Sequence, residues 1–229
     1  MRMAAVFSKD ERLRHIGHLD IMRAMQRALR RSGLPVSYSQ GFNPHILLGF
    51  ASALSTGAAS ERELMEVTLR GEVSAEEFLR RMNAALPPQM QLVRCFPLEE
   101  KGPALMSLVR AARWRVELLG EGAAAIAAAV PAFLQQEEIP SIRKTKSGEK
   151  EINLRPWIYS LSADGGTLHG TLALSEQANC KPDMLVRALA AFAGTEAPRM
   201  LATREELMGE DPAGQLIPLE VLLSPCEDS

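Results

Sequence analysis

At 229 residues, the chain is long enough to bury roughly 70% of its unfolded surface, and this length fits one larger domain or two small ones. Its 46% hydrophobic residues exclude a disordered chain, and only 5% aromatic residues give no sign of a nucleic-acid surface built mainly from stacked rings. Residues 1–110 hold 15 Lys and Arg against 11 Asp and Glu, a net charge of +4, while residues 111–229 hold 11 against 17, a net charge of −6. This asymmetry is compatible with an anionic partner on the first half. The net charge of +4 is nevertheless far below the basic excess of a domain devoted to nucleic acid.

Residues 1–98 predict six elements in the order βαββαβ. Short apolar runs predict strands over 2–8, 46–51, 63–70 and 91–98. Helical periodicity covers residues 19–32, which Gly33 ends, and residues 74–86, which a capping box of Ser74 and Glu77 opens. This is the order of the ferredoxin-like split βαβ unit, so we expect a ferredoxin-like domain over residues 1–98.

The same order recurs after a joining segment over 99–110. A strand over 114–119 is followed by a helix over 121–136 that Pro131 is expected to break or kink. The remaining predicted elements are a hairpin over 157–161 and 167–174, a helix over 182–193 and a last strand over 199–203. The 216–223 run adds an edge strand or packs on this half. We therefore predict an α+β protein of two tandem ferredoxin-like (βαββαβ) units, the second over residues 111–229.

An insertion at residues 139–154 interrupts the second unit and reads as a hairpin of its own. It is rich in cations that could contact phosphates without regard to base sequence: Arg143, Lys144, Lys146 and Lys150.

The predicted helix over 19–32 has two distinct faces. Its apolar positions, Ile21, Met22, Met25, Ala28 and Leu29, recur at helical spacing and are expected to face a core. The other face carries Asp20 and a basic stripe of Arg23, Arg27 and Arg30, with Arg31 alongside. This stripe is either a solvated face, with Asp20 and Arg23 paired at i, i+3, or a binding site for an anion such as RNA.

Residues 39–45 follow this helix as a loop suited to presenting side chains. A flexible Gly41 and the turn-forming pair Asn43-Pro44 surround an exposed type of aromatic residue. We expect Gln40, Phe42 and Asn43 to take part in binding RNA or another anion.

His18, Asp20 and His45 are the candidates for acid/base chemistry. A histidine that begins a helix often only hydrogen-bonds to backbone, and Asp20 suits the positive end of the helix dipole. The pair His18 and Asp20 lacks the third ligand and spacing of a convincing zinc motif, so no metal site is expected.

The stretch GHLDIMRAMQRALRRSGLPVSYSQGFNPH resembles the first motif of the radical-SAM-linked protein family, and KSGEKEINLRPWI resembles its second. Gly17 stands where that family usually has Ser, Ile46 where it has Pro, and Asn153 where an Asp is frequent. The resemblance covers nearly the whole chain. It implies a partner, a cobalamin-type radical SAM protein encoded beside or fused to such chains, and a genomic setting with a ribonuclease of the E/G type and ribosomal-protein genes.

Other signals exclude several classes of protein. The sequence has no CxxxCxxC, the thiolate set of a radical SAM cluster, and no nucleophile elbow, phosphate loop or HExxH, so no cofactor is expected. Cys95, Cys180 and Cys226 are too far apart to suggest a disulfide framework or metal clip. Early charges prevent a secretion signal and no apolar run reaches 18 residues, so we expect a cytoplasmic protein without membrane association.

Two functions remain. In the first, the protein is a non-catalytic accessory protein that binds RNA or a ribonucleoprotein, without DNA specificity, and works with the radical SAM partner in RNA modification or processing. In the second, it is a metal-independent RNA endonuclease or other RNA-processing enzyme that uses His18 and His45, by analogy with tandem ferredoxin-like endonucleases of CRISPR repeat processing.

Overall fold

The computed structural model describes residues 1–145 and 148–224, which fold as an α+β protein of mostly antiparallel strands, confirming the expected class. The chain divides into two compact units. Residues 1–109 form the first together with the described residues from 206 onward, and residues 110–205 form the second. The division therefore differs from the predicted domains in its last segment, because the chain beyond residue 205 groups with the first unit.

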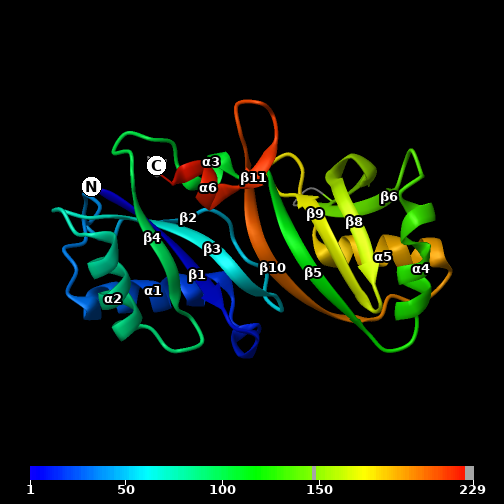
Figure 1. Ribbon diagram of the computed structural model, residues 1–229, viewed down its shortest axis with the longest axis horizontal. Helices are drawn as coiled ribbons and strands as arrows, with labels where there is room; N and C mark the ends of the chain where they lie inside the picture. Colours follow the sequence, from blue (N-terminus) through cyan, green and yellow to red (C-terminus); the bar gives the residue numbers. More distant parts are fainter. Residues whose placement is uncertain (146–147, 225–229) are drawn as a thin grey trace, which may run out of the picture. The chain divides into compact units, whose positions relative to one another are not determined.

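The first unit contains an antiparallel sheet in the order β4-β1-β3-β2 (Figure 1). Its main elements, in chain order, are β1 (Arg2–Lys9), α1 (His18–Ser32), β2 (Leu48–Phe50), β3 (Ala59–Thr68), α2 (Ala75–Ala85) and β4 (Leu92–Leu98). Shorter elements complete it: a 3₁₀ turn at Glu11–Leu13, α3 (Leu105–Leu108), β11 (Leu216–Pro218) and α6 (Leu219–Leu223). The apolar 216–223 run is thus a short strand, paired with β10 (Arg199–Glu210), followed by one helical segment.

β3 begins earlier than the apolar pattern predicted. The prediction covered 63–70, whereas the strand starts at Ala59, in a stretch with several polar residues. Ser60 and Glu63 are both buried, and the hydroxyl of Ser60 donates a 2.6 Å hydrogen bond to Oε1 of Glu63. Because the polar groups satisfy each other inside the protein, hydropathy alone did not reveal the start of the strand.

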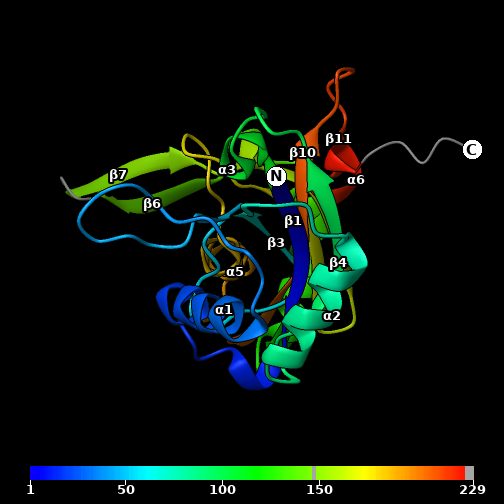
Figure 2. The same ribbon diagram turned by 90° about the vertical axis from the view of Figure 1, so that its left-hand side faces the viewer.

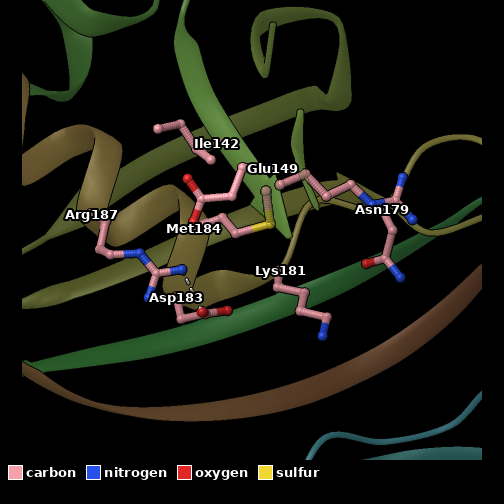
Figure 3. Close-up of a pocket in the computed structure, with 8 residues that line it drawn as sticks. Ile142, Glu149, Asn179, Lys181, Asp183, Met184 and Arg187 are labelled. Carbon is pink, nitrogen blue, oxygen red and sulfur yellow. Dashed lines mark hydrogen bonds and ion pairs between the residues drawn. The ribbon is translucent and has the colours of Figure 1, made fainter. Parts of the chain in front are cut away.

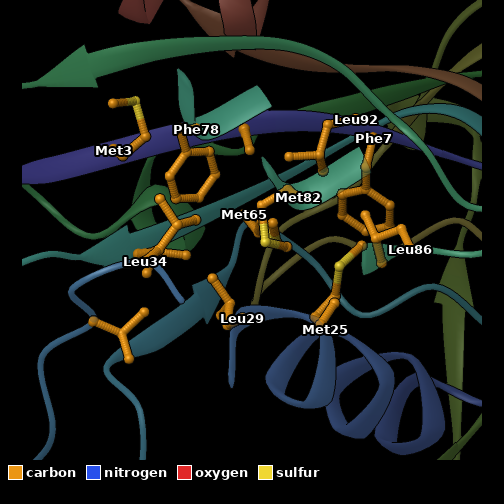
Figure 4. Packing of buried hydrophobic residues seen from close by; sticks show 14 of the residues in the cluster. Met3, Phe7, Met25, Leu29, Leu34, Met65, Phe78, Met82, Leu86 and Leu92 are labelled. Atoms are coloured by element: carbon orange, nitrogen blue, oxygen red, sulfur yellow. The ribbon is translucent and has the colours of Figure 1, made fainter. Parts of the chain in front are cut away.

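α1 ends where its sequence predicts and begins one residue earlier, and all its predicted core residues except Met22, which is half-buried, are buried. The helix ends at Gly33, whose φ of 66° is the left-handed conformation that glycine adopts without strain. Its buried residues are Ile21, Met25, Ala28 and Leu29. Met25 and Leu29 lie in the same core as Phe7, Met65 and Phe78, as Figure 4 shows. The opposite face of α1 is exposed and carries Arg23, Arg27 and Arg30.

α1 and α2 lie side by side, as Figure 2 shows, and each caps the last turn of the other. The guanidinium of Arg81 on α2 donates to the carbonyl oxygen of Ser32 at the end of α1, at 2.9 Å. In return, Arg31 on α1 donates to the carbonyl oxygen of Ala85 at the end of α2, at 2.6 Å. Cations at helix C-termini satisfy free carbonyls and oppose the helix dipole, so these arginines fix the packing of the two helices.

The second unit repeats the order, with an insertion. Its elements are β5 (Ala111–Leu119), α4 (Ala123–Phe133), β6 (Pro140–Thr145), β7 (Gly148–Asn153), a 3₁₀ turn at Arg155–Trp157, β8 (Ile158–Asp164), β9 (Thr167–Ala173), α5 (Pro182–Ala193) and β10. The strands run β8-β9-β5-β10, and β6 and β7 form a separate two-stranded hairpin. This hairpin is the insertion predicted at 139–154, although its Lys146 and Ser147 lie outside the described residues.

Several boundaries in the second unit differ from the prediction, and those of α4 and β10 differ for identifiable reasons. α4 runs through Pro131 and ends two residues later, short of the predicted end at 136. Proline has no N–H to donate to the carbonyl oxygen four residues earlier, so its effect is an early end to the helix. β10 continues past the predicted end at 203 to Glu210, because Leu207 and Met208 are buried and extend the apolar pattern.

We predict that Met25→Ala lowers the free energy of unfolding by about 2–5 kcal/mol, because the side chain is fully buried and its loss leaves a cavity. Chemical denaturation measures the change. Met106→Ala is the matched control: this side chain is 59% exposed on α3, and its truncation should cost less than about 0.5 kcal/mol. Equal losses in the two variants would contradict the proposed core.

Candidate nucleic-acid interface

A buried ammonium group holds the chain in place just before α1. Lys9, at the end of β1, is fully buried, and its Nζ donates hydrogen bonds to the carbonyl oxygens of Arg14 (3.3 Å), Ile16 (2.9 Å) and Ala58 (2.9 Å). The N–H of Gly57 also donates to the carbonyl oxygen of Arg14, at 2.7 Å. The segment that enters α1 is thereby attached to the segment that enters β3.

Arg14 strengthens this attachment from the other side. It is only 8% exposed, and its guanidinium donates to the carbonyl oxygens of Glu11 (3.2 Å) and Gly57 (3.3 Å). Its remaining nitrogen, Nη2, lies 3.8 Å from a carboxylate oxygen of Glu11. Arg14 therefore has a structural role and is not part of the exposed basic surface.

His18 lies at the first position of α1 and is half-buried. Its ring packs edge-on against Phe50 of β2, with ring centroids 5.1 Å apart, and Phe50 in turn packs against Phe7 of β1 at 5.9 Å. These contacts attach the start of α1 to the sheet. Asp20, two residues later, is exposed and pairs with Arg23 at 3.2 Å, an arrangement that contributes little to stability.

The loop between α1 and β2 has a closed stem and an exposed tip. Tyr38 and Ile46 form a β-bridge, and the N–H of Ser39 donates to the carbonyl oxygen of His45 at 2.8 Å. Oγ of Ser39 also lies 2.8 Å from Nδ1 of His45 and accepts a 3.1 Å hydrogen bond from the backbone N–H of His45. The stem therefore fixes both ends of residues 40–44 and orients the imidazole of His45.

The tip of this loop presents its side chains to solvent. Gln40, Gly41, Phe42 and Asn43 are all exposed, and Phe42 is 105% exposed, the value of a side chain with no neighbours. Gly41 has a φ of 127°, which a residue with a Cβ rarely adopts, so the glycine sets the turn before Phe42. A fully exposed phenylalanine forgoes roughly 1.5–3 kcal/mol of burial free energy, which makes it a candidate for contact with a partner.

The basic stripe on α1 is exposed but its members differ. Arg23 pairs with Asp20, and Arg31 caps α2. Arg27 and Arg30 are exposed and, within the part of the chain that the structure describes, neither has a hydrogen-bonding or ion-pair partner. These two guanidiniums are the members of the stripe most available to an anion.

In the second unit, β6 and β7 place the predicted hairpin cations in register. Arg143 lies opposite Lys150, and Lys144 lies opposite Glu149. Arg143 is half-buried, Lys150 is exposed, and Lys146 lies outside the described residues.

The three predicted acid/base residues have separate local environments. His18 packs on Phe50, Asp20 pairs with Arg23, and His45 bonds to Ser39. Over residues 1–145 and 148–224, no group of three or more His, Cys, Asp or Glu is arranged to hold a metal ion. The hydrogen bonds between Ser39 and His45 were not predicted from the sequence, in which only the position of Ser39 at the start of the loop indicates such a role.

The described cysteines are poorly suited to nucleophilic chemistry. Burial raises the pKa of the Cys95 thiol to about 12, and burial, with a smaller effect of the Asp183 carboxylate, raises that of Cys180 to about 12. Both thiols stay protonated at neutral pH, whereas the thiolate is the reactive form. Cys226 lies outside the described residues.

Comparison with known proteins assigns a family without a described activity. Residues 2–187 match a family described as an uncharacterised protein conserved in bacteria (DUF2344). No curated protein matches the chain. As for membranes, none of the helices within the described ranges is both long and apolar enough to cross one.

We predict that Lys9→Met lowers the free energy of unfolding by about 3 kcal/mol, because the carbonyl oxygens of Ile16 and Ala58 lose the Lys9 donor and that of Arg14 keeps only the Gly57 N–H. Chemical denaturation gives the total, and hydrogen exchange at the Gly57 amide reports on the attachment itself. Lys101→Met, at an exposed lysine of the same unit, should change stability by less than about 0.5 kcal/mol. A Lys9→Met protein as stable as the wild type would show that the attachment is dispensable.

Proposed function

The chain belongs to this family of uncharacterised bacterial proteins, DUF2344, and we propose that it is a non-catalytic accessory protein that binds RNA or a ribonucleoprotein. In this proposal it works in the cytoplasm and presents the RNA to a radical SAM partner for modification or processing. The observation that carries the proposal is the fully exposed Phe42 on a loop with a closed stem. The arginines of α1 in the same unit support it.

Phe42 and its neighbours have the chemistry to recognise an unpaired base. Every base has a flat face that stacks on an aromatic ring, and such stacking does not require a particular sequence. Gln40 and Asn43, exposed on either side of Phe42, carry amides that both donate and accept hydrogen bonds, as the edge of a base requires. This combination favours single-stranded RNA over a duplex, whose bases are stacked on each other.

Arg27 and Arg30 supply the contacts to the RNA backbone. An arginine without an ion-pair partner has no local carboxylate to displace when a phosphate binds, and its planar guanidinium can donate two parallel hydrogen bonds. Arg23 can join them when its weak surface pair with Asp20 opens. Arg31 is less available because it already caps α2.

The fold proposal is that both units are ferredoxin-like, the second with an inserted hairpin. The strand orders β4-β1-β3-β2 and β8-β9-β5-β10 support it, because in each unit the first strand lies between the third and the last. Such sheets, with their helices, serve many unrelated functions, so the fold gives no independent support for RNA.

The proposal of a radical SAM partner rests on a resemblance to the radical-SAM-linked family. The resemblance is carried by the HLD motif at residues 18–20 and the GFNPH motif at residues 41–45. The 229 residues contain no CxxxCxxC, so in this proposal the cluster chemistry belongs to the partner and this chain contributes the binding of RNA.

A metal-independent RNA endonuclease is the second candidate. The hydrogen bond between Oγ of Ser39 and Nδ1 of His45 orients the exposed ring of His45, which lies in the same loop as Phe42, as a general acid or base requires. The packing of His18 on Phe50 favours a structural role for that residue instead.

We predict that replacing Arg27 and Arg30 together by Gln reduces the salt dependence of single-stranded RNA binding. The slope of log Kobs against log salt concentration should become smaller by about 1.4, since each contact to a single-strand phosphate contributes about 0.7. Fluorescence anisotropy with a labelled oligonucleotide at several salt concentrations measures the slope.

Arg80→Gln combined with Lys101→Gln is the matched control for this experiment. It removes the same charge from exposed positions of the first unit, in α2 and in the segment after β4. Its slope should equal that of the wild type. Equal slopes in all three proteins would mean that the stripe on α1 is a solvated face.

We predict that Phe42→Ala weakens binding of single-stranded RNA by about 1–3 kcal/mol, the usual contribution of one base stacked on an aromatic ring. Thermal unfolding should be unchanged, because the ring contacts nothing in the folded protein. Phe42→Trp should retain affinity, as should Val93→Ala, which truncates another exposed apolar residue of this unit. Unchanged affinity in Phe42→Ala would show that Phe42 does not stack on a base. If the wild-type protein cleaved the RNA and His45→Ala did not, the endonuclease would be favoured.

A further inference from the structure

A pocket in the second unit lies between the inserted hairpin and the start of α5. It has a volume of about 720 Å³, within the range of small-molecule sites. β6 lies against α5, and the pocket is lined by Ile142, Arg143, Glu149, Asn179, Lys181, Asp183, Met184 and Arg187 (Figure 3). The lining thus comes from segments that are far apart in the sequence.

The charges in this pocket leave two cations available. Arg187 pairs with Asp183 at 2.7 Å, within one turn of α5, and Figure 3 shows this ion pair. Arg143 and Lys181 also line the pocket, and neither has an ion-pair or hydrogen-bonding partner among residues 1–145 and 148–224. A guanidinium and an ammonium from separate elements, with the amide of Asn179 beside them, are donors suited to a phosphate group.

The register of the hairpin also points to an anion. Arg143 lies directly opposite Lys150 on the neighbouring strand, so two cations occupy one cross-strand pair. Like charges at such positions destabilise a hairpin. An anion bound beside Arg143 would remove this repulsion.

The rest of the lining suits a ligand that is more than a phosphate. Met184 is buried and Ile142 is 57% exposed, so the pocket offers apolar surface next to its cations. Asp183 bonds to Arg187 through Oδ2, and a carboxylate has acceptor sites on both oxygens, so it can also accept from a hydroxyl group. A bare inorganic phosphate would leave both features unused.

We propose that this pocket binds a small nucleoside phosphate, with its phosphate between Arg143 and Lys181 and its base against Met184 and Ile142. This site is additional to the RNA-binding surface proposed for the first unit, and it does not depend on that function. Its ligand is a discrete molecule of mononucleotide size.

Isothermal titration calorimetry of the intact protein with AMP, adenosine and inorganic phosphate tests the proposal. AMP should bind at a single site and more tightly than either fragment. Arg143→Gln and Lys181→Gln should each weaken AMP binding about tenfold or more, the usual effect of losing a hydrogen bond to a charged group. Both side chains lie at the surface of the unit, and thermal unfolding of each variant verifies that it is folded.

Arg199→Gln is the matched control, because it removes one exposed cation of the same unit outside the pocket and should leave AMP affinity unchanged. Equal affinities for AMP and inorganic phosphate would overturn the nucleoside assignment. Undetectable binding of AMP to the wild-type protein would overturn the whole proposal. If, in addition, the two pocket variants lost RNA binding, Arg143 and Lys181 would be assigned to contacts with an RNA backbone. None of these results bears on Arg27, Arg30 or Phe42, so the two proposals can fail separately.

Discussion

The buried ammonium of Lys9 anchors the segment that leads into α1, the helix that carries the arginines of the candidate interface. Transferring a charged group from water to the protein interior costs several kcal/mol unless hydrogen bonds replace its hydration. Lys9 meets this condition through the carbonyl oxygens of Arg14, Ile16 and Ala58. The same bonds hold two irregular segments together, and with the core packing of α1 they help to fix the helix that carries Arg27 and Arg30.

Much of the local structure could be predicted because it is determined by neighbours in the sequence. The end of α1 follows from Gly33, and the start of α2 follows from the hydrogen bond between Ser74 and Glu77. The burial of Lys9 could not be predicted, because a lysine after an apolar strand is normally exposed, and one of its three acceptors, the carbonyl oxygen of Ala58, lies 49 positions away in the sequence. The membership of the chain beyond residue 205 in the first unit escaped prediction for a similar reason, since pairing between segments far apart leaves no periodic signal.

The candidate surfaces also differ in how far they could be predicted from the sequence. Arg27, Arg30 and Phe42 could be selected from helical spacing and from the composition of one loop, and the structure adds which of them lack partners. The pocket of the second unit had no counterpart in the sequence. Arg143 was selected only as a member of a basic hairpin, and nothing linked it to Asn179 and Lys181, which follow more than thirty positions later and approach it through the packing of β6 on α5.

The closed stem below Phe42 affects the thermodynamics of any encounter at this loop. Ordering the backbone of one flexible residue costs roughly 1–2 kcal/mol in conformational entropy at room temperature. The two ends of the loop are already ordered in the folded protein. They are held by the bridge between Tyr38 and Ile46 and by the bonds between Ser39 and His45. A ligand that binds the tip therefore has fewer degrees of freedom to immobilise, and more of its interaction free energy is retained as affinity.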